Sequence, residues 1–290
     1  MIKKAHLFML ILSVYMQALV FALVFLSVFA EAAYGMAADL LTLQNASLIL
    51  SFAVPFAVYM SVSKRKFAEV LPFAPLSAAN ALYVLVLSVS SIPLMMAVSF
   101  VSSAFFENNA AAFLTDLQGR PFFPVFLSLA ALPAVLEEIV FRGALLTELK
   151  AAGIKKAAVL SGLYFALIHM DFQQFPYAMI MGMIFAYLVL YTKSILASVF
   201  AHFIINASMV FLWLLDPDLE VYLLPACLAA APVFVYTFRN FLAHNAANAA
   251  ETGAESNAAD GPADKKLLTW EFWAVAGFYA VITIVYFNLS

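Results

Sequence analysis

Three charged residues stand close together in a strongly apolar part of the chain: Glu137, Glu138 and Arg142. On an α-helix, Glu138 and Arg142 are four residues apart and share a face, so we expect them to form an ion pair. Glu137 is turned by about 100° from Glu138 and has no basic residue three or four positions away. Two carboxylates in such different surroundings can divide two roles, one as an ion-pair partner and the other as a base.

A purely structural interpretation competes with this one. A Glu–Arg pair near a helix end is often only a satisfied bridge at the membrane interface. The additional Glu137 weakens that interpretation, because a buried carboxylate without a partner costs free energy.

Histidines supply the other candidates. Phe165 and His169 are four residues apart in one apolar segment, and His202 and Asn206 are four apart in another. A histidine inside a membrane helix is often a hydrogen-bonded interior residue, and the His202–Asn206 pair also fits a plain interhelical contact. We expect the remaining histidines to be solvated, because they lie near chain ends or loops: His6 and His244.

Depth in the membrane decides whether these groups meet. Counted at about 1.5 Å per residue from the nearest flanking lysine, Glu138, His169 and Asn206 lie roughly 18 to 20 Å deep, and His202 roughly 14 Å. Residues from three separate helices therefore fall in one layer. Independent structural pairs would have little reason to do so.

The elements that must position these residues are membrane helices. The chain has 290 residues, of which 66% are hydrophobic and 11% charged, whereas a soluble domain is about half apolar and a quarter charged. We expect an all-α, polytopic transmembrane helical bundle of eight or nine spanning helices, nine being the central estimate. The expected spans are 7–30, 46–63, 77–105, 121–149, 157–170, 174–192, 195–215, 220–240 and 269–288. The first is longer than the apolar region of a signal peptide, so we expect it to remain uncleaved.

The positive charges predict the orientation. Alternating the nine spans from a cytoplasmic N-terminus leaves Arg120 as the only basic residue outside, with Arg142 inside a span. The cytoplasmic side receives Lys3, Lys4, Lys64, Arg65, Lys66, Lys150, Lys155, Lys156, Lys193, Arg239, Lys265 and Lys266. We expect a multi-pass protein of a cell membrane, and the short loops favour a prokaryotic one.

The chain divides into five predicted parts. Residues 1–120 form N-terminal transmembrane helices, 121–215 the core that carries the candidate residues, and 216–244 a further transmembrane helix. Residues 245–267 are rich in Ala, Asn, Glu and Gly and predict a flexible cytoplasmic linker. Residues 268–290 form the last helix. The single cysteine, Cys227, permits no internal disulfide, and a net charge of -3 argues against a nucleic-acid partner.

The three motifs together resemble those of the CPBP family of CAAX proteases and bacteriocin-processing (Abi) proteins, which includes the Ras-converting prenyl-protein endopeptidase. The family pattern is Glu-Glu-x-x-x-Arg, Phe-x-x-x-His and His-x-x-x-Asn or Asp on successive membrane helices. The motifs Glu137-Glu138-x-x-x-Arg142, Phe165-x-x-x-His169 and His202-x-x-x-Asn206 match it at every position. The resemblance covers residues 121–215.

The resemblance implies an all-helical intramembrane endopeptidase that acts on a membrane-associated polypeptide in contact with lipid. Glu137 would be the general base and His169 would hold the water or share its proton. Glu138 and Arg142 would orient the site, and His202 with Asn206 would stabilise an oxyanion. We favour water activation without a cofactor. A zinc site of Glu137, His169 and His202 is the alternative, although no His-Glu-x-x-His helix is present.

Two other classes remain open. Layers of Glu, His and Asn also build proton relays in ion-coupled transporters and channels, but here the polar residues are concentrated on three helices and inverted repeats are not apparent. A catalytically silent immunity or scaffold protein on the same fold is the third class. The sequence indicates neither the substrate nor the oligomeric state.

Overall fold

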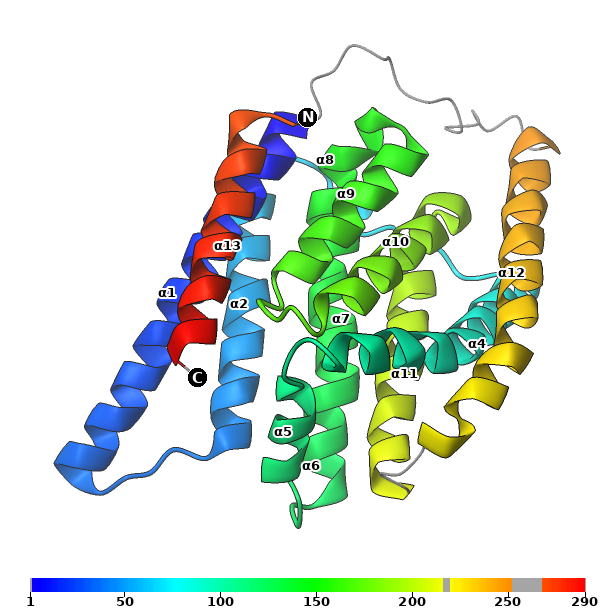
Figure 1. The fold of residues 1–290 in the computed structure, drawn as a ribbon. Coiled ribbons are helices and arrows are strands. Elements are labelled where there is room, and N and C mark those ends of the chain that lie inside the picture. Colours follow the sequence, from blue (N-terminus) through cyan, green and yellow to red (C-terminus); the bar gives the residue numbers. More distant parts are fainter. Residues whose placement is uncertain (1, 216–219, 252–267, 290) are drawn as a thin grey trace.

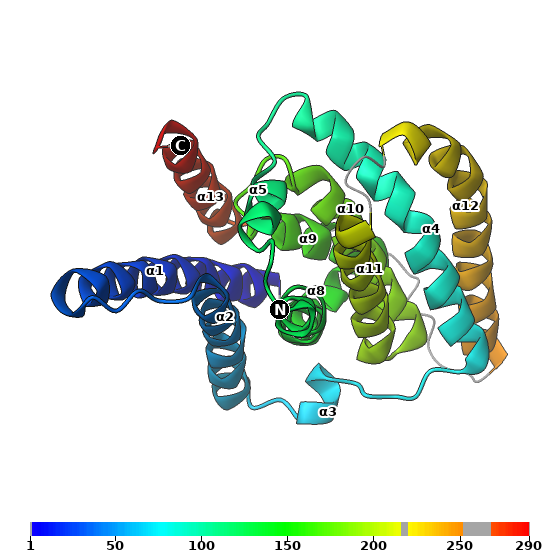
Figure 2. The same ribbon diagram turned by 90° about the horizontal axis from the view of Figure 1, so that it is seen from below.

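The computed structural model describes residues 2–215, 220–251 and 268–289, and over these ranges the regular structure is helical, without strands. Figure 1 shows a bundle in which α7 to α11 occupy the middle, α1, α2 and α13 lie on one side, and α4 and α12 lie on the other. The view from below shows α4 and α12 side by side, and α1 pointing away from the rest of the bundle (Figure 2). The all-α, polytopic prediction is confirmed.

The helices follow one another with short connections. The N-terminal part contains α1 (Ile2–Tyr34), α2 (Leu40–Ser63), α3 (Phe67–Val70), α4 (Ala78–Ser103) and α5 (Asn109–Asp116). The later part contains α9 (Ile154–Leu167), α10 (Phe175–Thr192), α11 (Ile195–Leu215), α12 (Glu220–Glu251) and α13 (Trp270–Leu289).

Between α5 and α9 runs one long helical segment from Phe122 to Ala152. It changes its hydrogen-bonding pattern several times along its length. In chain order it consists of α6 (Phe122–Phe126), the π-helix η1 (Leu127–Ala131), α7 (Leu132–Glu138), the π-helix η2 (Ile139–Leu145), α8 (Leu146–Leu149) and the 3-10 turn η3 (Lys150–Ala152).

Among the residues that the structure describes, seven helices meet the length and hydropathy expected of a membrane span: α1, α2, α4, the 122–152 segment, α10, α11 and α12. The estimate of eight or nine spans also counted α9 and α13. Helix α9 has only 14 residues, about 21 Å at the α-helical rise and so short of the roughly 30 Å hydrocarbon core. Helix α13 has 20 residues, about 30 Å at the same rise, which is long enough to span.

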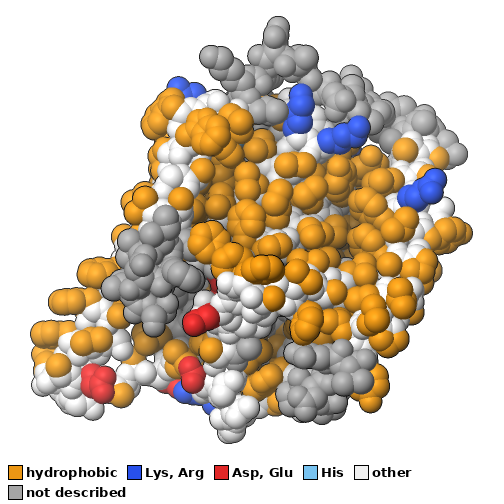
Figure 3. All heavy atoms as spheres, in the orientation of Figure 1, with side chains coloured by type: hydrophobic (Ala, Val, Ile, Leu, Met, Phe, Trp, Pro, Cys, Tyr) orange, Lys and Arg blue, Asp and Glu red, His pale blue; other side chains and the backbone are white. Residues whose placement is uncertain are grey.

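The surface fits a membrane as solvent. In Figure 3 hydrophobic side chains cover a broad band, with Lys and Arg toward the upper end and Asp and Glu toward the lower end. Large apolar residues on this outside are widely exposed, for example Phe21, Val62 and Tyr236. Such exposure is costly in water and normal in lipid.

The prediction that His169 lies within a helix is wrong. Helix α9 ends at Leu167, and His169 lies in the turn that follows. The chain turns there because Met170 adopts a left-handed backbone conformation with φ 50. The Asp171 carboxylate then accepts hydrogen bonds from the backbone N–H groups of Gln173 and Gln174 at the start of α10, so the polar residues after His169 begin a new helix.

The linker predicted at 245–267 begins too early. Helix α12 continues to Glu251, and Asn245 is a buried helical residue. Its side-chain amide exchanges two hydrogen bonds with that of Asn80 on α4, at 2.9 and 3.1 Å. Alanine-rich sequence is a good helix former, and this amide pair fastens the segment to α4. The rest of the predicted linker, 252–267, lies outside the described residues.

The expectation that His6 and His244 are solvated is also wrong. His6 is fully buried, because α13 covers α1 there: the His6 ring contacts Phe272 with ring centroids 5.6 Å apart and its Nδ1 is hydrogen-bonded to Tyr164. His244 is half-buried on α12, against the ring of Tyr83.

Candidate active site

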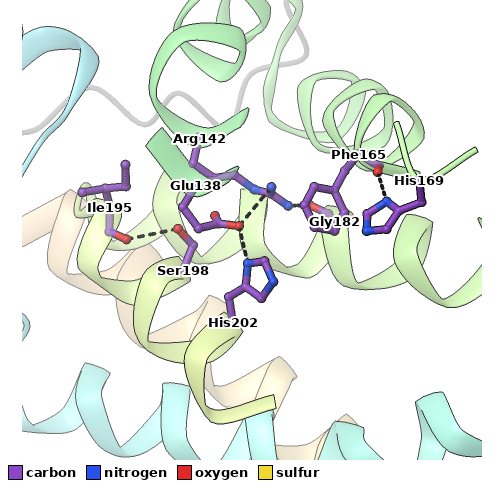
Figure 4. A network of polar contacts seen from close by, with 8 residues as sticks. All are labelled: Glu138, Arg142, Phe165, His169, Gly182, Ile195, Ser198 and His202. Atoms are coloured by element: carbon purple, nitrogen blue, oxygen red, sulfur yellow. Dashed lines mark hydrogen bonds and ion pairs between the residues drawn. The ribbon is translucent and has the colours of Figure 1, made fainter. Parts of the chain in front are cut away.

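A buried carboxylate stands at the centre of the site. Oε1 of Glu138 lies 3.2 Å from Nη1 of Arg142 and 3.0 Å from Nδ1 of His202 (Figure 4). The exposed fractions of the three residues are 0%, 1% and 6%. The predicted ion pair between Glu138 and Arg142 is therefore confirmed, and His202 of α11 joins it from another helix.

Arg142 is enclosed by acceptors and rings. Its Nη2 donates a hydrogen bond of 3.0 Å to the backbone carbonyl of Gly182 on α10. Its guanidinium carbon lies 4.5 Å from the ring centre of Phe165 and 5.2 Å from that of Phe185. Aromatic faces stabilise a desolvated cation, so this charge is held in one place by two helices besides its own.

The local helix geometry is unusual where the motif lies. Helix α7 ends at Glu138, and Arg142 sits inside the π-helix η2. Short π-helical stretches are rare and frequently occur at functional sites. A Cβ atom on Gly143 would lie 2.6 Å from a methyl group of Leu71, so this glycine admits the close approach of the residues after α3.

His202 is oriented by its neighbours. Because Nδ1 faces a carboxylate, it donates its proton to Glu138, and Nε2 is left for other partners. The ring stacks on Phe185 with centroids 5.1 Å apart and meets the edge of Phe165 at 5.8 Å. The imidazole is thus fixed on one side and open on the other.

His169 is held in the same manner by a different acceptor. Its Nδ1 lies 2.7 Å from the backbone carbonyl of Phe165, which can only accept, so Nδ1 donates and Nε2 remains available. The His169 ring also packs on the Phe165 ring, with centroids 5.1 Å apart. Phe165 therefore touches Arg142, His169 and His202, one residue from each motif.

Glu137 differs from Glu138 as the sequence predicted. It is 8% exposed, and among the described residues neither a hydrogen bond nor an ion pair reaches its carboxylate. Both His202 and His169 lie within electrostatic range of this carboxylate, and neither is hydrogen-bonded to it. Asn206 lies one turn beyond His202 on α11 and is partly exposed. Among the described residues, none forms a hydrogen bond with its side-chain amide.

Three further residues at the site were not predicted from the sequence. Gly182 and Phe185 come from α10, which carries none of the motifs, and Ser198 of α11 lies beside the Glu138 carboxylate in Figure 4. Nothing in a single sequence marks a backbone carbonyl or a stacking phenylalanine for such a role. Their position between the second and third motifs was the one available signal.

A zinc ion would need at least three ligand side chains close together. Within the described part of the chain, no three His, Cys, Asp or Glu residues are grouped closely enough to hold a metal ion.

One comparison with known proteins matches the segment that carries this site. Residues 119–208 match the family model described as type II CAAX prenyl endopeptidase Rce1-like. Neither the search of curated proteins nor that of solved structures found a significant match. The matched segment contains all three motifs and α10, and its family is a peptidase family. Residues 119–208 are therefore similar to the Rce1-like CAAX proteases, in agreement with the resemblance seen in the sequence.

Proposed function

We propose that the protein is an intramembrane endopeptidase that hydrolyses a peptide bond of a membrane-associated polypeptide, with water activated by Glu137 and His169. One observation carries the proposal. Inside a membrane-spanning bundle, Glu138, Arg142 and Phe165 fix one another, while the Glu137 carboxylate and two Nε2 atoms remain uncommitted. An unsatisfied carboxylate beside two oriented imidazoles is suited to move a proton.

The reaction follows from these free groups. Glu137 accepts a proton from water while the water oxygen bonds to the carbonyl carbon of the scissile peptide. The carbonyl oxygen becomes an oxyanion. When the carbonyl re-forms, the C–N bond breaks and the proton held by Glu137 passes to the leaving nitrogen. His169, with Nδ1 held by a carbonyl, receives a hydrogen bond from the water at Nε2 and orients it.

The oxyanion needs donors, and the two candidates are not equivalent. The Asn206 amide donates in every protonation state. Nε2 of His202 donates only when the ring is charged, because its Nδ1 proton is already directed at Glu138. Asn206 is therefore the permanent oxyanion donor, and His202 adds a second hydrogen bond as an imidazolium. Activation of the water by Glu137 and His169 without a metal remains part of the proposal.

The decisive experiment compares two glutamates of one helical segment. Purified protein in detergent is given a fluorogenic peptide ending in a prenylated CAAX sequence, and the same peptide without the prenyl group. Glu137→Gln is expected to abolish cleavage. The matched control is Glu148→Gln. Glu148 is also buried, but it binds Arg65 and Tyr59, at 2.8 and 2.9 Å, and a glutamine oxygen keeps both contacts.

The outcomes separate the competing classes. Cleavage that survives Glu137→Gln contradicts the mechanism. If the wild type cleaves neither peptide but gives ion-dependent uptake in sealed vesicles, the protein is a transporter. If deletion of the protein changes the phenotype of the cells and neither Glu137→Gln nor His169→Ala does, the protein is a catalytically silent scaffold or immunity protein.

A further inference from the structure

The turn that carries His169 lies inside the bundle. Figure 1 shows the chain leaving α9 and entering α10 near mid-height, away from either end. Non-helical backbone at such a depth must be satisfied by neighbouring protein. Met170 adds strain, because a non-glycine residue with positive φ is uncommon. This turn therefore depends on its contacts to keep its shape.

Those contacts come from the end of α4 and the start of α5. The side-chain nitrogen of Gln173 lies 2.7 Å from Oγ of Ser99 and 3.0 Å from Oγ of Ser103. On the outside of the same turn, Asn109 donates a hydrogen bond of 3.2 Å to the Asp171 carboxylate. The rings of Phe106 and Phe172 are 5.4 Å apart.

Gln173 is the buried member of this set. Its exposed fraction is 0%, whereas Phe106 and Phe172 are 37% and 43% exposed. A buried amide that donates to two hydroxyls and lies 3.1 Å from the Ser99 carbonyl fixes position far better than exposed groups do. The catalytic constellation needs such support, because a misplacement of about 1 Å costs about 100-fold in rate.

We propose that Gln173 is a positioning residue for His169: it holds the 168–174 turn against α4, so that Nε2 of His169 stays directed at the water beside Glu137. This rests on the proposed function for its kinetic consequence, and its structural part stands alone. Gln173 belongs to none of the three motifs and touches no reacting atom.

The test compares two buried amides that bind the same helix. Gln173→Leu removes the bonds to the C-terminal end of α4. Asn245→Leu removes the amide pair with Asn80 near the other end of α4, far along the helix from the site. Ser99→Ala removes one acceptor of Gln173 and keeps its carbonyl, which gives a milder variant should Gln173→Leu fail to fold.

Three quantities are measured on each variant: kcat and KM, melting temperature, and the rate at which diethylpyrocarbonate modifies His169, followed by mass spectrometry. Gln173→Leu is expected to lower kcat about tenfold or more with little change in KM, and to raise the His169 modification rate severalfold. Ser99→Ala should shift both in the same direction. Asn245→Leu should lower the melting temperature and leave both readouts unchanged.

Two results overturn the inference: unchanged kcat and His169 reactivity in Gln173→Leu, or equal changes in Asn245→Leu at the same loss of melting temperature. Failure of the proposed function is distinct from either. If the proposed function is wrong, either the wild type does not cleave the peptide or the Glu137→Gln variant still cleaves it. The modification rate of His169 then still shows whether Gln173 holds the turn in place.

Discussion

At the scale of single residues, the site is a balance of buried charges. Glu138 and Arg142 are excluded from solvent together, and His202 is directed at the same oxygen atom. Each of these charges alone would be costly to bury, and the ion pair offsets part of that cost, although Oε2 of Glu138 and Nε of Arg142 have no hydrogen-bond partner among the described residues. Glu137 takes no part in these ion pairs, so its carboxylate is available to react.

This difference predicts opposite phenotypes for two adjacent positions. Glu138→Gln leaves the Arg142 charge buried without a counter-ion, so the free energy of unfolding should fall by about 3 kcal/mol or more. Glu137→Gln removes a charge that has no partner, so stability should be unchanged or higher. Denaturant unfolding in detergent measures both. Equal losses for the two variants would show that the two carboxylates are not distinct.

The residue-level predictions succeeded where they depended on local spacing. The Glu138–Arg142 pair follows from a separation of four residues and survives the π-helical distortion between them. The hydrogen-bond acceptor of His169 was not predicted. That acceptor is the backbone carbonyl of Phe165, four residues earlier in the same segment. The ring of Phe185 comes from a helix without a motif, so only tertiary structure reveals it.

At the scale of elements, α9 and α10 pack closely, so that Gly182 and Phe185 of α10 reach Arg142 and His202. Glycines face each other at their crossing. A Cβ atom on Gly182 would lie 2.7 Å from Cα of Gly162 and 3.0 Å from Cβ of Phe165. Small residues allow this close packing of membrane helices, and the same Gly182 presents its carbonyl to Arg142.

We therefore expect Gly182→Ala to destabilise the bundle by about 1–3 kcal/mol, as overpacking does, and to reduce cleavage because Phe165 must move. Gly277 on α13 is the control. A Cβ there meets nothing within 4 Å, so Gly277→Ala should be neutral or stabilise the helix by up to about 1 kcal/mol. The melting temperatures of the two variants, compared with that of the wild type, test this expectation. A harmless Gly182→Ala would mean that α9 and α10 separate without cost.

Element boundaries were predicted less well than element types. Apolar content locates the helices but does not show that α9 stops at Leu167, since its end depends on Met170 and on the turn that the Asp171 carboxylate stabilises before α10. Likewise, the Ala- and Asn-rich sequence from Asn245 lacks apolar periodicity. It is helical to Glu251 because Asn80, which is 165 residues away in sequence, pairs with it.

At the scale of the whole molecule, basic groups gather at one end of the bundle. At this end the Glu148 carboxylate, hydrogen-bonded to Arg65, holds the pKa of that guanidinium above its usual value. Burial, together with the nearby charge of Lys150, lowers the pKa of Lys193. At the other end Arg120 pairs with Asp39 and holds the pKa of that carboxyl below its usual value.

This asymmetry predicts that the basic end faces the cytoplasm. Two exposed positions at opposite ends provide the test, Lys66 after α2 and Gln118 before the 122–152 segment. Each is replaced by cysteine in a Cys227→Ala background, because Cys227 is the only native thiol. In intact cells, a membrane-impermeant maleimide should label Gln118→Cys and spare Lys66→Cys, whereas both should react after permeabilisation. The reverse pattern would place the N-terminus outside.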